Sequence, residues 1–278
     1  IEGTPYPSPV GWLVIEGLEL RNGSEGVKLM NTHDIILRKN YIHDNANQGI
    51  LGASARVTID QNVIARTGLQ SSQFHEHGIY MQGTDIAITN NLIDSNHAYG
   101  IQIAAYSYNS GTHAVPEYAG ATNWLISNNT IALQDVRGGI IVWNAGTAPS
   151  GITVQNNIFY RNSESTNGDN AVGYLGSYNN IVVRNNLSYT TSGSASLPSG
   201  NGNIVGQDPR FVDLSVSNFR LQSNSPAINT GIAQLTPSVD IAGVLRPQGS
   251  APEIGAYEFG GTADTTPPTA PGNLRVSN

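Results

Sequence analysis

The chain has 278 residues, of which 38% are hydrophobic and 12% charged, with a formal net charge of −7. The negative charge argues against a nucleic-acid partner, because phosphate binding needs a basic surface. The absence of cysteine excludes a disulfide scaffold and a thiolate metal site, and no apolar run is long enough for a membrane-spanning helix.

A block of alternating apolar residues, then Asn, then an apolar pair recurs along most of the chain. The first copy, residues 12–19, has Gly17 in the Asn position, and the later copies are centred on Asn40, Asn62, Asn91, Asn129, Asn157 and Asn186. Successive centres are 23, 22, 29, 38, 28 and 29 residues apart, which indicates a coil of about 22 residues with loop insertions of variable length.

A second motif, Gly followed by alternating apolar residues, precedes most of these blocks. It begins at Gly26, Gly49, Gly78, Gly100 and Gly139. Alternation with period two predicts short strands whose inward side chains stack from coil to coil. Asn tolerates a left-handed turn and can hydrogen-bond along a stack, so we expect an asparagine ladder in an all-β solenoid.

The Asn ladder and the Gly-Ile-x-Ile strand resemble the pectate-lyase-like superfamily of right-handed parallel β-helices. The resemblance covers roughly residues 10–205, and we expect residues 1–205 to form the coils. Residues 206–260 resemble the closing segment of many secreted bacterial β-helix proteins, which predicts a cap over the open end of the solenoid. Residues 261–278 read as a Pro-rich linker and the start of a fibronectin type III-like module.

The resemblance implies that sugar binds the outer face of the first sheet, between flanking loops. The two longest insertions, residues 65–77 and 104–123, predict those loops. The outward positions of the predicted strands are Lys28, Met30, Leu51, Tyr80, Gln82, Gln102, Ile141 and Trp143. Of these we interpret Lys28 as a solvated strand residue.

The most unusual local sequence, His75-Glu76-His77, meets the start of one such strand. We predict a polysaccharide lyase that cleaves a uronate polymer by β-elimination, which needs a neutralised carboxylate, a base and an acid. We assign His77 or His75 as the base, Tyr80 as the acid and Arg137 as the carboxylate partner. The predicted substrate-binding residues are Gln82, Tyr99, Gln102, Trp143, Tyr106 and His113.

Several alternatives stay open. His75 and His77 are equally explained as turn residues that hydrogen-bond the backbone. Glu76 and Asp135 are the metal-ligand candidates, and Ca²⁺ is the one cofactor that we consider.

A glycoside hydrolase needs two carboxylates that flank one bond. The candidates Glu76, Asp85, Glu117 and Asp135 include no two at adjacent strand positions. The third class is a non-catalytic carbohydrate-binding adhesin. We expect a secreted or cell-surface bacterial protein, monomeric, with a polysaccharide as its partner.

Overall fold

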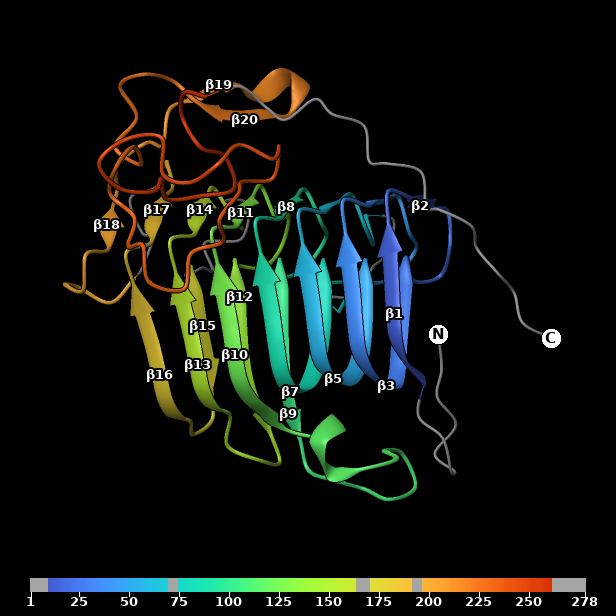
Figure 1. The fold of residues 1–278 in the computed structure, drawn as a ribbon. Helices are drawn as coiled ribbons and strands as arrows, with labels where there is room; N and C mark the ends of the chain where they lie inside the picture. Colours follow the sequence, from blue (N-terminus) through green and yellow to red (C-terminus); the bar gives the residue numbers. More distant parts are fainter. Residues whose placement is uncertain (1–9, 70–74, 164–170, 192–196, 262–278) are drawn as a thin grey trace.

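The computed structural model describes residues 10–69, 75–163, 171–191 and 197–261. Strands of successive coils lie side by side and in parallel along one axis (Figure 1). The predicted parallel β-helix is therefore confirmed. The two helices of the described part, η1 (Pro116–Tyr118) and η2 (Leu214–Val216), are single 3-10 turns. Neither is long or apolar enough to cross a membrane.

The largest sheet combines the first and second strands of the coils. In three coils these two strands form one long strand, which bends at a left-handed residue such as Asp34 or Arg56. In the coils that follow these three, loops separate the two strands. The strands are β1 (Val10–Glu16), β3 (Val27–Arg38), β5 (Ile50–Asp60), β7 (Ile79–Thr89), β9 (Ile101–Tyr106), β10 (Ala121–Ser127), β12 (Ile140–Ala145), β13 (Ser150–Gln155), β15 (Val172–Leu175) and β16 (Asn179–Arg184).

We call the face formed by β9, β12, β15 and the first halves of β3, β5 and β7 the first sheet. The second halves of those long strands join β1, β10, β13 and β16 as the second sheet. The short strands form the third sheet. They are β2 (Glu19–Arg21), β4 (Tyr41–His43), β6 (Val63–Ala65), β8 (Leu92–Asp94), β11 (Thr130–Ala132), β14 (Ile158–Tyr160), β17 (Leu187–Tyr189) and β18 (Ile204–Val205).

Inward side chains stack in register to form one continuous core. One such row runs through Ile35, Val57, Ile86, Trp124 and Ile152, all of them buried. Because coils repeat about every 4.8 Å, each apolar side chain packs on its counterparts above and below. This stacking explains why strands of only three residues are stable in the third sheet.

The predicted asparagine ladder is confirmed. Each Nδ2 donates to Oδ1 of the Asn one coil further on, from Asn40 through to Asn186, at 2.9–3.0 Å. Asn203 extends the ladder by one further step. The placement of Gly17 in the ladder was wrong, because the backbone of Leu18 pairs with Asn40. Gly17 instead takes the left-handed position before the ladder, with φ 70°.

A second ladder, which the sequence analysis missed, follows the third strand of each coil. Backbone N–H groups donate along it to the side-chain oxygens of Asn45, Asn96, Gln134 and Asn162. Each of these residues lies five positions after a member of the first ladder. That constant offset is the signal from which it could have been found.

Residues 206–261 cover the outer flank of the third sheet, and Figure 1 shows this segment lying over β8, β11, β14 and β17. It contains the antiparallel pair β19 (Phe211–Asp213) and β20 (Asn218–Leu221). Phe211, Phe219 and Ile254 form a second apolar cluster with Ile158 and Leu187 of the third sheet. The described contacts of this segment run along the flank, and closure of the open end stays a prediction.

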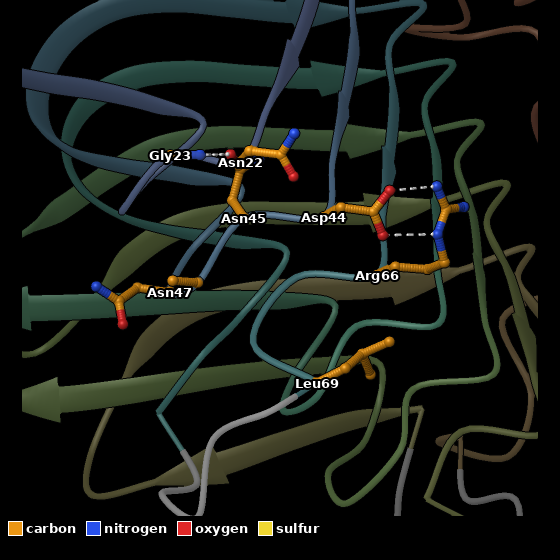
Figure 2. A pocket seen from close by; sticks show the side chains of 8 residues that line it. Asn22, Gly23, Asp44, Asn45, Asn47, Arg66 and Leu69 are labelled. Carbon is orange, nitrogen blue, oxygen red and sulfur yellow. Dashed lines mark hydrogen bonds and ion pairs between the residues drawn. The ribbon is translucent and has the colours of Figure 1, made fainter.

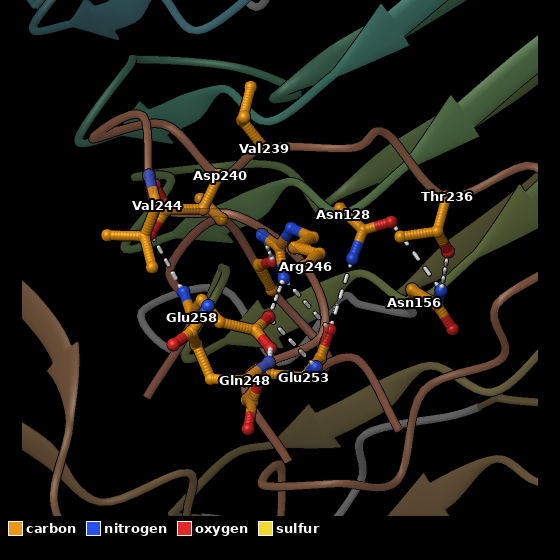
Figure 3. Close-up of polar contacts among 12 residues, drawn as sticks. Asn128, Asn156, Thr236, Val239, Asp240, Val244, Arg246, Gln248, Glu253 and Glu258 are labelled. Carbon is orange, nitrogen blue, oxygen red and sulfur yellow. Dashed lines mark hydrogen bonds and ion pairs between the residues drawn. The ribbon is translucent and has the colours of Figure 1, made fainter. Parts of the chain in front are cut away.

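The turns before the first ladder hold this segment in place. Asn90, Asn128 and Asn156 are all left-handed, and each donates its side-chain amide to a backbone carbonyl of residues 232–253. Inside the segment, Arg246 and Glu258 form a buried ion pair at 2.7 Å (Figure 3). The predicted linker and fibronectin-like module were assigned to residues 261–278, of which 262–278 lie outside the described residues.

Candidate functional site

A groove of about 390 Å³ lies on the outer face of the first sheet, the face on which the family resemblance leads us to expect sugar. Its floor is formed by outward residues of β3, β5 and β7, and Tyr106 with the loop that follows it forms a wall. The lining residues are Lys28, Met30, Leu51, Gly52, Ala53, Tyr80, Met81, Gln82, Tyr106, Ser107, Asn109, Thr112 and His113. Five of the eight predicted outward positions are among them.

The wall is a loop, residues 107–120, that leaves β9 and folds back toward the first coil. Asn31 fixes its middle, since its side chain donates to the Thr112 carbonyl and accepts from the Ala114 N–H. Arg56 holds Glu117 at 2.8 Å and also contacts Asp34. The loop thus bridges residues 61 to 83 positions apart in the sequence, and these contacts fix its place beside the groove.

The side chains of Gln82 and His113 hold this loop in place. The two side chains contact each other, and Gln82 also donates to the Tyr118 carbonyl at 3.2 Å. The other nitrogen of His113, Nδ1, accepts from the Asn109 N–H. Burial lowers the pKa of His113, so its ring is neutral at pH 7. Both predicted sugar-binding residues are therefore buried groups that shape the wall.

Tyr80 and Tyr106 meet above the first sheet. Their hydroxyl groups are 2.8 Å apart, and the ring of Trp143 packs edge-on against Tyr106 at 5.5 Å. Burial and the bond to Tyr106 raise the pKa of Tyr80 well above its usual value. Tyr80 therefore keeps its proton at neutral pH, which suits a proton donor.

His77, Tyr99 and Arg137 lie together where the first sheet begins. The His77 ring is 5.5 Å from that of Tyr80 and 5.6 Å from that of Tyr99. The Arg137 guanidinium lies 5.9 Å from the centre of the Tyr99 ring. The structure thus brings four of the predicted site residues into one chain of contacts, which continues through Tyr106 to Trp143.

The hydrogen bonds of His77 determine what it can do. Its Nδ1 accepts from the Tyr99 N–H at 3.1 Å, so the neutral ring carries its proton on Nε2. Burial, assisted by His75 and Arg137, lowers the pKa of His77 to about 3. Among the described residues Nε2 has no hydrogen-bond partner although it is buried. His77 is thus arranged as a donor, and a role as base is not favoured.

The remaining histidines and acids of this edge lie in its turns. His75 is exposed, and its N–H donates to the carboxylate of the buried Glu76. His97 pairs with Asp135 at 3.1 Å. In the described part of the chain, His, Cys, Asp and Glu nowhere gather in a group of three or more that could hold a metal. Among these residues, Glu76 and Asp135 are therefore not joined by a further cluster of acidic or histidine side chains.

Lys28, which the sequence analysis set aside as a solvated strand residue, also lies in the groove. It lies two coils before Tyr80 in one outward row, through the pairs Lys28–Leu51 and Leu51–Tyr80. It lines the groove and is exposed. The next position of the row, Gln102, faces outward but is largely buried. A positive charge at this place suits a carboxylated sugar.

The carboxylates considered for a hydrolase are dispersed. Asp85 accepts from Asn123, and Glu117 pairs with Arg56. None of the described residues lining the groove is Asp or Glu. The described lining of the groove therefore does not supply the pair of carboxylates that glycoside hydrolysis requires.

A second hollow, of about 620 Å³, opens at the turns that follow β2, β4 and β6. Figure 2 shows Arg66 bonded through two nitrogens to Asp44, with Asn22, Asn45 and Asn47 around them. Among the described residues of its lining, the charged side chains are those of this ion pair. None of the predicted site residues lies in it, so the groove of the first sheet is the stronger candidate.

Residues 13–115 match the protein family described as "Right handed beta helix region". The structure is similar to the crystal structure of pectate lyase Pel9A, with a TM-score of 0.51 and 18% sequence identity. The chain is a right-handed parallel β-helix.

The aligned part covers 88% of this β-helix and 59% of the pectate lyase chain. At this identity the two chains share the fold, and their common chemistry does not follow from it. No curated protein matches the sequence.

Proposed function

We propose that this β-helix binds a uronate-containing polysaccharide in the groove of the first sheet and cleaves it by β-elimination. The observation that carries the proposal is the lining of the groove. It combines one ammonium group, Lys28, with the protonated phenol of Tyr80 and with no carboxylate among its described residues. Such a lining favours an acidic sugar.

Each requirement of the elimination has a candidate side chain. Lys28 takes the C5 proton in its neutral amine form, which the ammonium group reaches by first losing a proton to solvent. Tyr80 protonates the leaving oxygen. The Nε2–H of His77, beside Tyr80, donates to the sugar carboxylate, because a buried donor without a partner gains a hydrogen bond when ligand arrives. Arg137, over the ring of Tyr99, adds positive charge near His77, and Trp143 supports Tyr106 by packing against it.

The lyase is tested by absorbance near 235 nm during incubation with polygalacturonate, alginate and glycosaminoglycans, with and without added Ca²⁺. Lys28→Met and Tyr80→Phe should each lower the rate by about 100-fold or more, as loss of a general base or acid does. Lys39, the only other lysine, pairs with Glu16 outside the groove, so Lys39→Met is the matched control and should keep full activity. No absorbance change on any polymer would exclude the lyase.

One observation favours a second candidate, a binding protein without turnover. His77, which the sequence offers as base, is held as a donor. Affinity electrophoresis in gels that contain each polymer separates the two candidates. Retardation of the protein, weakened by Lys28→Met but without product at 235 nm, would establish binding alone. We also propose that the chain acts outside a bacterial cell, where such polymers occur.

A further inference from the structure

Tyr80 and Tyr106 lie at opposite ends of the first sheet's width. Tyr80 is the second residue of β7, whereas Tyr106 is the last residue of the next strand, β9. Tyr80 pairs in register with Gln102, four residues before Tyr106, so about 13 Å of strand separates the two positions. The hydroxyl contact at 2.8 Å therefore requires both rings to lean diagonally over the sheet. We call this pair the tyrosine crossbar.

The burial of the residues between the two tyrosines supports this geometry. Gln102 and Ala104 both face outward on β9, yet they are only 9% and 0% exposed. On the N-terminal side, Lys28 at an equivalent outward position is exposed. On the other side, Trp143 pairs in register with Ala104 and packs against Tyr106. The first sheet is thus covered at the crossbar and open at Lys28.

The groove also ends there. Apart from Tyr106 at the end of β9, every strand residue in its lining belongs to β3, β5 or β7. None belongs to β12 or β15. Its volume of about 390 Å³ is near the lower limit of small-molecule pockets, about 300–1,000 Å³. The described groove therefore has room for a few sugar rings on one side of the crossbar.

We propose that the tyrosine crossbar closes one end of the groove, so that the site takes the end of a polysaccharide chain and not an internal segment. This inference rests on the proposed function, since it concerns the same groove. An internal segment would have to pass over the two linked phenols, whereas a chain end stops against them. Tyr80 is then a residue that both touches the terminal sugar and fixes where the chain stops.

The test counts protein molecules bound per polysaccharide chain, using size-fractionated polygalacturonate and alginate of two chain lengths. The wild-type protein should bind with a constant stoichiometry per chain, whatever the length. Tyr106→Ala removes one half of the crossbar, and its stoichiometry should rise with chain length. Tyr41→Ala is the matched control, because Tyr41 is as exposed as Tyr106, at 37%, but lies on the third sheet.

If cleavage occurs, the products give a second readout. The wild type should release short oligosaccharides from the start with a slow fall in viscosity, and Tyr106→Ala should lower the viscosity faster for the same number of bonds cut. Wild-type binding that grows in proportion to chain length would overturn the crossbar proposal and leave the proposed function standing. Failure to bind any acidic polymer would overturn the proposed function and, with it, this inference.

Discussion

Asn91 donates its side-chain amide to Oδ1 of Asn129 at 3.0 Å, although 38 residues separate them. The neighbouring pair Asn62 and Asn91, only 29 residues apart, has the same distance. The spacing along the ladder is therefore independent of coil length. Loop 107–120 projects sideways from its coil. A long wall can therefore be added to the groove without disturbing the core.

The ladder predicts a large stability effect at its centre. Asn129 is fully buried, and its Nδ2 donates to Asn157 and to the carbonyls of Ile88 and Ser127. Asn129→Ala should lower the free energy of unfolding by about 2–4 kcal/mol, since several buried groups lose their partners. Chemical denaturation measures it. Asn179→Ala, at an exposed strand position, should cost under about 0.5 kcal/mol, and equal losses would contradict the prediction.

The turns before the ladder predict a difference between two substitutions at one position. Asn156 has φ 53° and bonds both the N–H and the carbonyl of Ile232. Asn156→Gly and Asn156→Ala both lose these bonds, but only alanine must also enter the left-handed region, at about 1 kcal/mol. The alanine variant should therefore be the less stable by that amount. Similar unfolding free energies for the two variants would show that the backbone at residue 156 leaves the left-handed conformation when alanine is introduced.

Asp94 predicts a pH dependence of stability. It is 5% exposed on β8, and burial raises its pKa to about 6. Because the folded pKa exceeds the unfolded value of 3.8, the stability that Asp94 contributes is complete below pH 3.8 and is lost as pH rises through 6. The loss is on the order of 3 kcal/mol. Asp94→Asn should remove it, so the difference in unfolding free energy between variant and wild type should change between pH 4 and 7.

The wall of the groove predicts a local effect without a global one. Glu117 and Arg56 are both 38% exposed, and such pairs contribute at most about 1 kcal/mol. Glu117→Gln should leave the unfolding free energy within that range but increase amide hydrogen exchange across residues 107–120. Asp135→Gln provides a control, because its partner His97 lies in another turn. Unchanged exchange in the loop would mean that Asn31, Gln82 and His113 hold it without the ion pair.

The stacked part of the fold could be predicted from the sequence because coil stacking repeats the same residue types. The Asn residues of the first ladder are invariant from coil to coil, so they reveal the period. The second ladder escaped notice because Gln134 and Thr67 occupy two of its positions, and because the flanking left-handed residues are chemically diverse. Gly17 was misplaced by one residue for a related reason. It shares only its left-handed backbone conformation, and not its residue type, with the residues that precede the ladder in later coils.

The candidate site was harder to predict, because its walls come from contacts without a period. The bond between Asn31 and Ala114 spans 83 residues and follows no repeat. Gln82 and His113 both line the groove, but their mutual contact could not be foreseen from the sequence. Lys28 was set aside because one exposed lysine carries no sequence signal. Its significance comes only from the row it shares with Tyr80.

The C-terminal segment touches the same turn position in five different coils, at Gln61, Asn90, Asn128, Asn156 and Asn185. A ladder by itself sets no limit on how many rungs it has, and insertion of one more coil would leave every rung bonded. The segment, however, would then be one repeat out of step with its docking points. The segment therefore fixes the number of coils. After duplication of a central coil, the core should still stack, but the C-terminal segment should no longer match its docking points on the flank.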